Sequence, residues 1–171
     1  MKPVLVCRTA WMDLYAGIRD GDTPIGGGSY VKDVGFGHEV FNFLPNRQGV
    51  FQGYVRPGPA NGINIGRLGA PADADRVDDV LVFWVATHPT LGRTRVVGWY
   101  DEATVFRWWQ SSLKKRPLPN GEDAGFSVEA PVATLLPSDD RVFELPRATS
   151  SKAGMGPVSY THLTLPTSDL V

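Results

Sequence analysis

Short apolar runs alternate along this chain with glycine- and proline-rich turns, and most runs carry a polar residue at every second position. A period of two between turn residues predicts a β-strand. The run Val80–Ala86 has no polar interruption and is apolar at both parities, which predicts a strand buried on both faces. Pro131 breaks the last long run. The predicted strands cover residues 4–6, 50–56, 63–68, 79–87, 95–100, 104–109, 126–136 and 141–145.

A different period marks the segment after the first strand. Trp11, Leu14, Tyr15 and Ile18 recur at i, i+3, i+4 and i+7, which predicts one apolar face of a short helix. The turn residues 20–24 end it. Two interpretations of Trp11 stay open, because it lies either in the core or in the wall of a pocket.

The segment Gly26–Phe43 is rich in glycine and also carries polar and aromatic side chains. Its local pattern favours a glycine turn between two strands, with His38 and Glu39 paired at the sheet edge. The alternative is a recognition surface, because glycine leaves backbone N–H groups open to close approach. Ser29, Tyr30 and Asn42 would then contribute side chains to the same surface.

The composition narrows the fold class. The chain has 171 residues, of which 42% are apolar, and this fits one domain with a core. Nineteen glycines and fourteen prolines, many short strands and a single helix predict a small curved β-barrel in the α+β class. Cys7 is the single cysteine, so an internal disulfide framework is excluded. With no signal segment or long apolar run in the sequence, we expect a cytoplasmic protein with no membrane contact.

The formal net charge of −1 argues against binding nucleic acid through bulk charge. A nucleic-acid site must therefore be a local patch. Asn64 and Arg67 either contact a phosphate or base or are simply solvated, and both interpretations stay open. The other candidates for phosphate contact are Arg107, Lys114, Lys115 and Arg116.

The sequence offers little support for catalysis or metal binding. Cys7 lies in an apolar run without the electropositive setting that activates a thiolate. Ser29, His38 and Glu39 have the residue types of a triad but no nucleophile-elbow motif. The histidines lack zinc-site spacing, and the glycine run lacks the Lys-Ser/Thr of a phosphate loop. We therefore expect a binding module that uses no cofactor and no metal.

Aromatic residues carry a stronger signal. Five tryptophans and five tyrosines are many for one domain, and several adjoin polar or basic residues. Aromatic rings stack on nucleobases, and a neighbouring basic loop can hold phosphates. The alternative is that the tryptophans fill the core and the basic loop is a solvated face.

The tail 157–171 has the pattern of neither a core nor a linker and resembles the in-frame translation of a sequencing adapter. We expect residues 1–150 to form the domain and 151–156 to begin a truncated connection to a further region. The tail would then take no part in the fold.

Several ordered motifs resemble one family, the EVE-like domain of the PUA superfamily, as found at the N-terminus of HNH endonucleases that cut modified DNA. The resemblance spans about residues 4–156. The motifs are Gly-Gly-Gly-Ser-Tyr at 26–30, Gly-His-Glu-Val-Phe-Asn-Phe at 37–43, Ile-Asn-Ile at 63–65, Val-Val-Gly-Trp-Tyr at 96–100, Ala-Thr-Val-Phe-Arg at 103–107, Asp-Arg-Val-Phe at 140–143 and Gly-Met-Gly at 154–156.

This resemblance implies a PUA-like β-barrel, related to YTH readers, that flips a modified base into an aromatic pocket. It implies polar readers or supports at His38, Glu39 and Asn42. The pocket candidates that complete the set are Trp11, Ser29, Tyr30, Trp84, Trp99 and Tyr100.

The expected partner is duplex DNA with a modified cytosine, such as 5-methylcytosine or 5-hydroxymethylcytosine. The module would target a restriction nuclease whose HNH motif is not in this sequence. A reader of modified or single-stranded RNA is the alternative. A hydrolase that uses His38 and Glu39 is a third, weaker hypothesis. The sequence indicates no oligomeric state.

Overall fold

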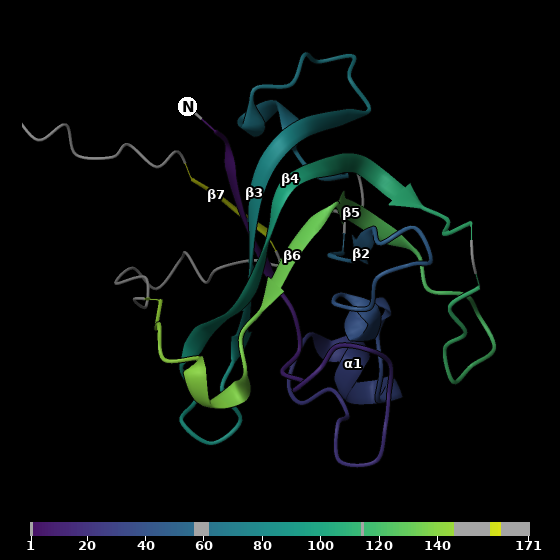
Figure 1. Cartoon of the computed structure of the whole chain (residues 1–171), viewed down its shortest axis with the longest axis vertical. Helices are drawn as coiled ribbons and strands as arrows, with labels where there is room; N and C mark the ends of the chain where they lie inside the picture. Colours follow the sequence, from purple (N-terminus) through teal and green to yellow (C-terminus); the bar gives the residue numbers. More distant parts are fainter. Residues whose placement is uncertain (1, 57–61, 114, 146–157, 162–171) are drawn as a thin grey trace, which may run out of the picture.

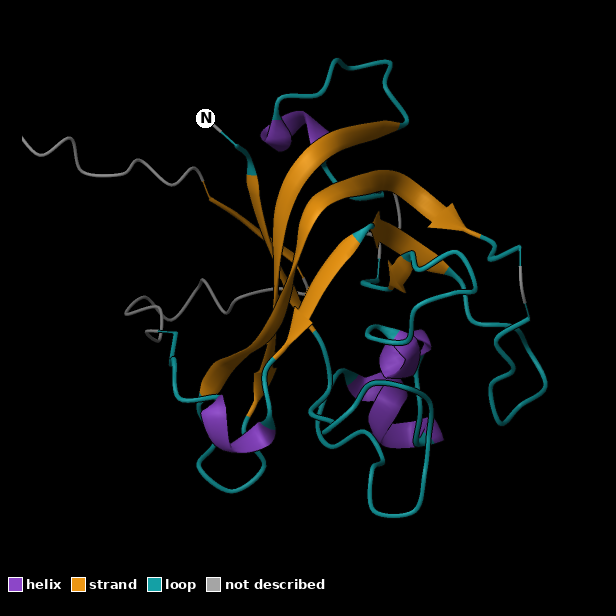
Figure 2. Ribbon diagram, in the orientation of Figure 1, coloured by secondary structure: helices purple, strands orange, loops and turns teal. Residues whose placement is uncertain are grey.

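The computed structural model describes residues 2–56, 62–113, 115–145 and 158–161. Two long, curved strands, β3 and β4, run side by side through the middle of the molecule (Figure 1). The helices are short separate pieces rather than a continuous layer (Figure 2). In chain order the elements are β1 Val4–Arg8, α1 Ser29–Val34, the 3-10 helix η1 His38–Phe41, β2 Phe51–Gly53, the 3-10 helix η2 Ile65–Leu68, β3 Arg76–Thr87, β4 Thr94–Gln110, β5 Phe126–Ala130, β6 Val132–Leu135, the 3-10 helix η3 Ser138–Asp140 and β7 Val158–Thr161.

The strands form one sheet in the order β2-β5-β4-β3-β1-β7, and β6 also pairs with β4. Among the strand pairs of the described residues, only β1–β3 is parallel. Among the described residues this sheet is open, with β2 and β7 at the two ends of its path. The fold is therefore mostly sheet with a few short helices, which confirms the α+β class.

Strands β5 and β6 lie one after the other along the same edge of β4. Glu129 pairs with Thr104, and Ala133 pairs with Tyr100, so the register is unchanged across the break between the two strands. Pro131 stands at that break. Proline has no N–H to donate to the ladder, which explains why the pairing stops there and then resumes.

The core lies against one face of β3. Val80, Val82, Trp84 and Ala86 alternate along this strand and are fully buried. Of the residues between them, Leu81 and Phe83 are only partly buried, whereas Val85 is fully buried. The uninterrupted run was thus correctly predicted as a strand, but one of its faces is less covered than expected.

The predicted helix at residues 11–18 is wrong. This segment is irregular, with bends at 13–14 and 16–17 and an isolated bridge from Trp11 to Ile25, and Leu14 and Ile18 are exposed. Tertiary partners take the backbone groups that a helix would bond internally. The Asp22 carboxylate accepts the N–H groups of Asp13 and Leu14, and the Arg141 guanidinium donates to the carbonyls of Met12 and Asp13.

The glycine-rich segment is not a turn between two strands. It forms α1 and η1, and Gly35 ends α1 in the left-handed conformation, with φ of 85°. The period-two pattern at residues 63–68 also misled, because Ile65–Leu68 is the 3-10 helix η2. Residues 141–145 form a single bridge, Arg95 to Glu144, rather than a strand. These segments lie outside the strand ladders, where a local alternation has no neighbouring strand to stabilise it.

Four residues of the tail that we expected to take no part in the fold form β7, which pairs antiparallel with β1. Main-chain pairing at a sheet edge requires no particular side chains, so an extended segment of almost any sequence can add to the exposed edge of β1. Among the described residues, no helix has the length and apolar character needed to span a membrane.

Candidate nucleic-acid interface

Three of the predicted pocket residues lie in the core. Trp84, Tyr100 and Asn42 are fully buried, and the Trp84 and Tyr100 ring centroids are 5.3 Å apart. The Tyr100 hydroxyl donates to the Asn42 carbonyl, and the Asn42 Oδ1 accepts the Tyr54 N–H at 2.9 Å. These residues lie inside the core and do not face solvent. Their hydrogen bonds anchor the end of η1 and the chain that follows β2.

Trp11 is also a core residue, with 6% of its surface exposed. Its ring lies 4.8 Å from the His88 ring and 4.9 Å from the Arg141 guanidinium carbon. Trp99 is partly buried against Phe83. Trp11 and Trp84 thus belong to the buried core cluster and Trp99 contacts Phe83, so the structure does not gather the predicted tryptophans into an open cage.

A different set of rings comes together at the surface. The His38 ring stacks on the Tyr54 ring at 4.7 Å with an interplanar angle of 28°, and the Trp109 ring meets His38 edge-on at 6.4 Å. We call His38, Tyr54 and Trp109 the ring cluster. Its members come from η1, from the residue after β2 and from the end of β4. Trp109 is 45% exposed, so the cluster presents aromatic surface to solvent.

His38 is held in one tautomer. Its Nδ1 accepts the Gly125 N–H at 3.0 Å, so the proton of the neutral ring is on Nε2. Burial lowers the pKa of His38 below its ordinary value, which favours this neutral form. The cluster therefore offers a hydrogen-bond donor at His38 Nε2.

Glu39 follows His38 in η1, and the charge of its carboxyl acts on Tyr54 of the ring cluster. Burial raises the pKa of its carboxyl, while backbone N–H groups of Glu39 and Ala10 that donate to it act in the opposite direction. Burial also raises the pKa of Tyr54, with the charge of Glu39 as the next cause. Ser29 and Tyr30 are exposed on the nearby helix α1. The Gly-His-Glu motif thus places His38 in the ring cluster and the Glu39 charge within electrostatic reach of Tyr54.

Two of the predicted phosphate contacts are anchored elsewhere. The Arg116 side chain is buried and donates to the carbonyls of Gln52 and Leu44. Arg107 donates to the carbonyls of Ala72 and Ala74. Both guanidinium groups therefore hold loops against the sheet, and the structure does not support a phosphate role for Arg116.

The other predicted phosphate contacts that the structure describes are exposed. Lys115 is exposed in the loop after β4, and Lys114 lies outside the described residues. Asn64 and Arg67 are exposed at η2. The described cationic surface near the ring cluster is therefore smaller than the sequence suggested.

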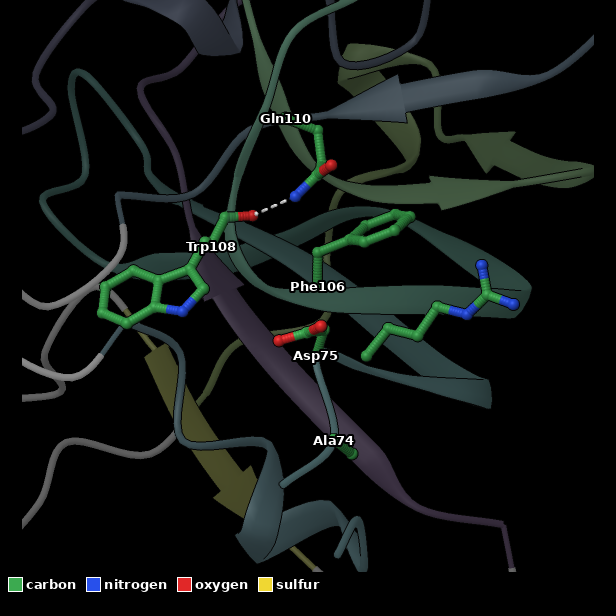
Figure 3. Close-up of a pocket in the computed structure, with 6 residues that line it drawn as sticks. Ala74, Asp75, Phe106, Trp108 and Gln110 are labelled. Carbon is green, nitrogen blue, oxygen red and sulfur yellow. Dashed lines mark hydrogen bonds between the residues drawn. The ribbon is translucent and has the colours of Figure 1, made fainter. Parts of the chain in front are cut away.

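The opposite face of β4 carries a hollow of about 660 Å³ that the sequence did not reveal (Figure 3). Phe106, Trp108 and Gln110 line it from β4, with Ala74, Asp75 and Arg76 on the other side. The alternation predicted for residues 104–109 had placed Trp108 and Trp109 on opposite faces, and the structure confirms it. That alternation is the sequence signal for two separate aromatic surfaces, one with Trp108 and one with Trp109.

Comparison with protein-family models, with curated proteins and with solved structures finds no match for this chain. Within the described part of the chain, no group of three or more His, Cys, Asp or Glu side chains could hold a metal ion. The geometry of the ring cluster therefore carries the functional argument.

Proposed function

We propose that this chain binds nucleic acid that carries a modified base, with a modified cytosine in duplex DNA as the target. The observation that supports this is the ring cluster, which combines the exposed aromatic surface of Trp109 with the fixed donor of His38, while the charge of the Glu39 carboxyl acts on Tyr54. A base flipped out of a duplex needs these elements: rings to stack on and polar groups to read its edge. The motifs imply a PUA-like barrel, of which the curved β3–β4 pair would form part.

The chemistry of the cluster suits cytosine. The cytosine edge offers an amino donor at N4 beside acceptors at N3 and O2, and a glutamate can accept from N4. Glu39 would take the amino group and His38 Nε2 would donate to an acceptor. A methyl or hydroxymethyl group on the base would contact the rings. The chain would then act as the targeting module of a modification-dependent nuclease, with no catalysis of its own.

Fluorescence anisotropy of the full chain with short labelled duplexes tests this proposal. The duplexes differ at one site, which carries cytosine, 5-methylcytosine or 5-hydroxymethylcytosine. Trp109→Ala should reduce affinity for the preferred duplex by about 5- to 150-fold, because a stacked base contributes about 1–3 kcal/mol. Trp108→Ala is the matched control, because Trp108 is 46% exposed on the other face of β4 and should keep the preference. Equal affinity for all three duplexes at matched salt would disprove the proposal.

Phosphate contacts should act separately from base recognition. Replacing Lys114 and Lys115 with alanine should weaken binding to all duplexes alike and reduce its salt dependence. A change in the preference among the three duplexes would instead assign these lysines to base recognition.

A reader of modified or single-stranded RNA is the second candidate. The two half-exposed tryptophans on successive residues favour it, since aromatic platforms bind unpaired bases of any sequence. Competition between single-stranded RNA and the modified duplex separates the two candidates. Displacement of the duplex by equimolar RNA would favour the RNA reader.

A further inference from the structure

The hollow on the face of β4 opposite the ring cluster is lined by two aromatic side chains, Phe106 and Trp108. We call its six lining residues, Ala74, Asp75, Arg76, Phe106, Trp108 and Gln110, the β4 hollow. Its volume of about 660 Å³ lies within the range of small-molecule sites. It shares no residue with the ring cluster, so a ligand of the β4 hollow is independent of the proposed function.

The Trp108 ring is an exposed and supported platform. Trp108 is 46% exposed, and Gly62 packs against its ring, since a Cβ on Gly62 would be 3.1 Å from Trp108 Cε3. The N–H of Ile63 donates to the Arg107 carbonyl at 2.8 Å and holds the Gly62 segment in place. Phe106 is fixed by an edge-on contact with Phe126 at 5.7 Å. Such rings favour a flat ligand.

The polar groups around this platform are mainly acceptors. Gln110 Nε2 donates to the Trp108 carbonyl at 3.0 Å, which leaves its Oε1 as an acceptor (Figure 3). The backbone carbonyl of Asp75 accepts the Arg107 N–H. Asp75 lines the hollow and is exposed, and among the described residues none donates to its carboxylate. A ligand here needs N–H donors on its edge.

One cation accompanies these acceptors. The Arg76 side chain is 61% exposed, and its Nε lies 3.8 Å from Asp78, too far for a hydrogen bond. A positive charge at the rim favours a ligand that carries an anionic group beside its donor edge.

We propose that the β4 hollow binds the guanine base of a nucleotide. Among the standard bases, guanine presents two adjacent N–H donors, at N1 and N2, which match the two oxygens of one carboxylate. In this arrangement the base stacks on Trp108, Asp75 accepts from N1 and N2, and Arg76 contacts the phosphate. The nucleotide can be free or part of an unpaired strand, since both share this chemistry.

Isothermal titration calorimetry of the full chain with guanosine, adenosine, cytidine and uridine 5′-monophosphates tests the inference. We expect the guanosine nucleotide to bind most tightly. Trp108→Ala should weaken it by about 5- to 150-fold, and Trp109→Ala should leave it unchanged. Asp75→Asn should remove the preference for guanosine over adenosine, because an amide presents one acceptor in place of two.

Two further arms complete the experiment. The deoxynucleotides TTGTT and TTATT distinguish the sources: tighter binding of TTGTT than of guanosine monophosphate indicates a strand, and weaker or equal binding indicates a free nucleotide. Trp108→Phe should retain part of the affinity, which separates lost stacking from misfolding.

Three outcomes would each overturn the inference: equal binding of all four nucleotides, tighter binding of N-acetylarginine amide than of guanosine monophosphate, or a loss of guanosine binding in Trp109→Ala equal to that in Trp108→Ala. If the chain binds guanosine monophosphate but does not prefer the modified duplexes, the proposed function alone is overturned.

Discussion

Gly125 and Trp109 are in such close contact that a Cβ atom on Gly125 would overlap the indole ring at Nε1. The same glycine donates its N–H to His38 Nδ1. One residue without a side chain therefore positions two of the three rings of the ring cluster. This contact joins the loop before β5 to the end of β4 and to η1.

Gly125→Ala should consequently displace Trp109. We expect a loss of stability of about 1–3 kcal/mol, typical of overpacking, and a loss of modified-duplex binding close to that of Trp109→Ala. Urea denaturation and anisotropy measure the two effects. Gly28→Ala is the control, because Gly28 has φ of −78° and open space where a Cβ would lie. Normal binding by Gly125→Ala would show that Trp109 does not contact the base.

The protonation of His38 gives a second prediction. Burial lowers its pKa below 6.5, so the folded state takes up this proton less readily than the unfolded chain does. The stability that neutral His38 contributes is fully present above pH 6.5 and is lost as the pH falls toward the lowered pKa. Nitrogen-15 NMR should show a midpoint below 6.5 and the proton on Nε2, with His38→Gln used for assignment. A proton on Nδ1 would contradict the hydrogen bond from Gly125.

Glu39 should respond to pH in the opposite sense. Burial raises the pKa of its carboxyl above 4.5, so its contribution to stability is present below pH 4.5 and is lost as the pH rises through the raised value. His38→Gln should keep this response and lose the one due to His38. The pH dependence of the urea midpoint, measured for both proteins, tests the assignment.

Arg141 should be among the most sensitive positions of the fold. Its side chain is fully buried, donates to the carbonyls of Leu136, Met12 and Asp13, and faces the Trp11 ring. Arg141→Ala leaves these carbonyls unpaired and should cost about 3–5 kcal/mol in urea denaturation. Arg141→Lys should not restore stability, because an ammonium group lacks the planar fork.

A matched control for Arg141 is Arg93→Ala. Arg93 forms a surface ion pair with Glu144 and is 65% exposed. Its removal should cost less than about 1 kcal/mol. Similar losses at the two positions would mean that the buried guanidinium does not organise the segment after β1.

Cys7 should be chemically inert in the folded protein. It is fully buried in β1, and burial raises the pKa of its thiol far above the ordinary value. A colorimetric thiol reagent should label it only after unfolding in urea. Rapid labelling of the native protein would show that β1 opens under native conditions.

The sequence by itself determined most of the sheet. Strand β3 follows from an uninterrupted apolar run, β4 follows from a period of two, and β5 and β6 follow from the last long run. All of these are local patterns that each residue shares with its nearest neighbours. The break at Pro131 follows from the chemistry of one residue. The placement of Trp108 and Trp109 on opposite faces also follows from this period.

Tertiary structure decided the rest. Residues 11–18 have a helical pattern, yet Asp22 and Arg141 take the backbone groups that a helix needs. Trp84 and Trp109 are the same residue type, and only the packing of distant elements makes one a core residue and the other a surface residue. The ring cluster joins residues far apart in the chain. A local pattern contains no information on such contacts, because each depends on where other segments fold.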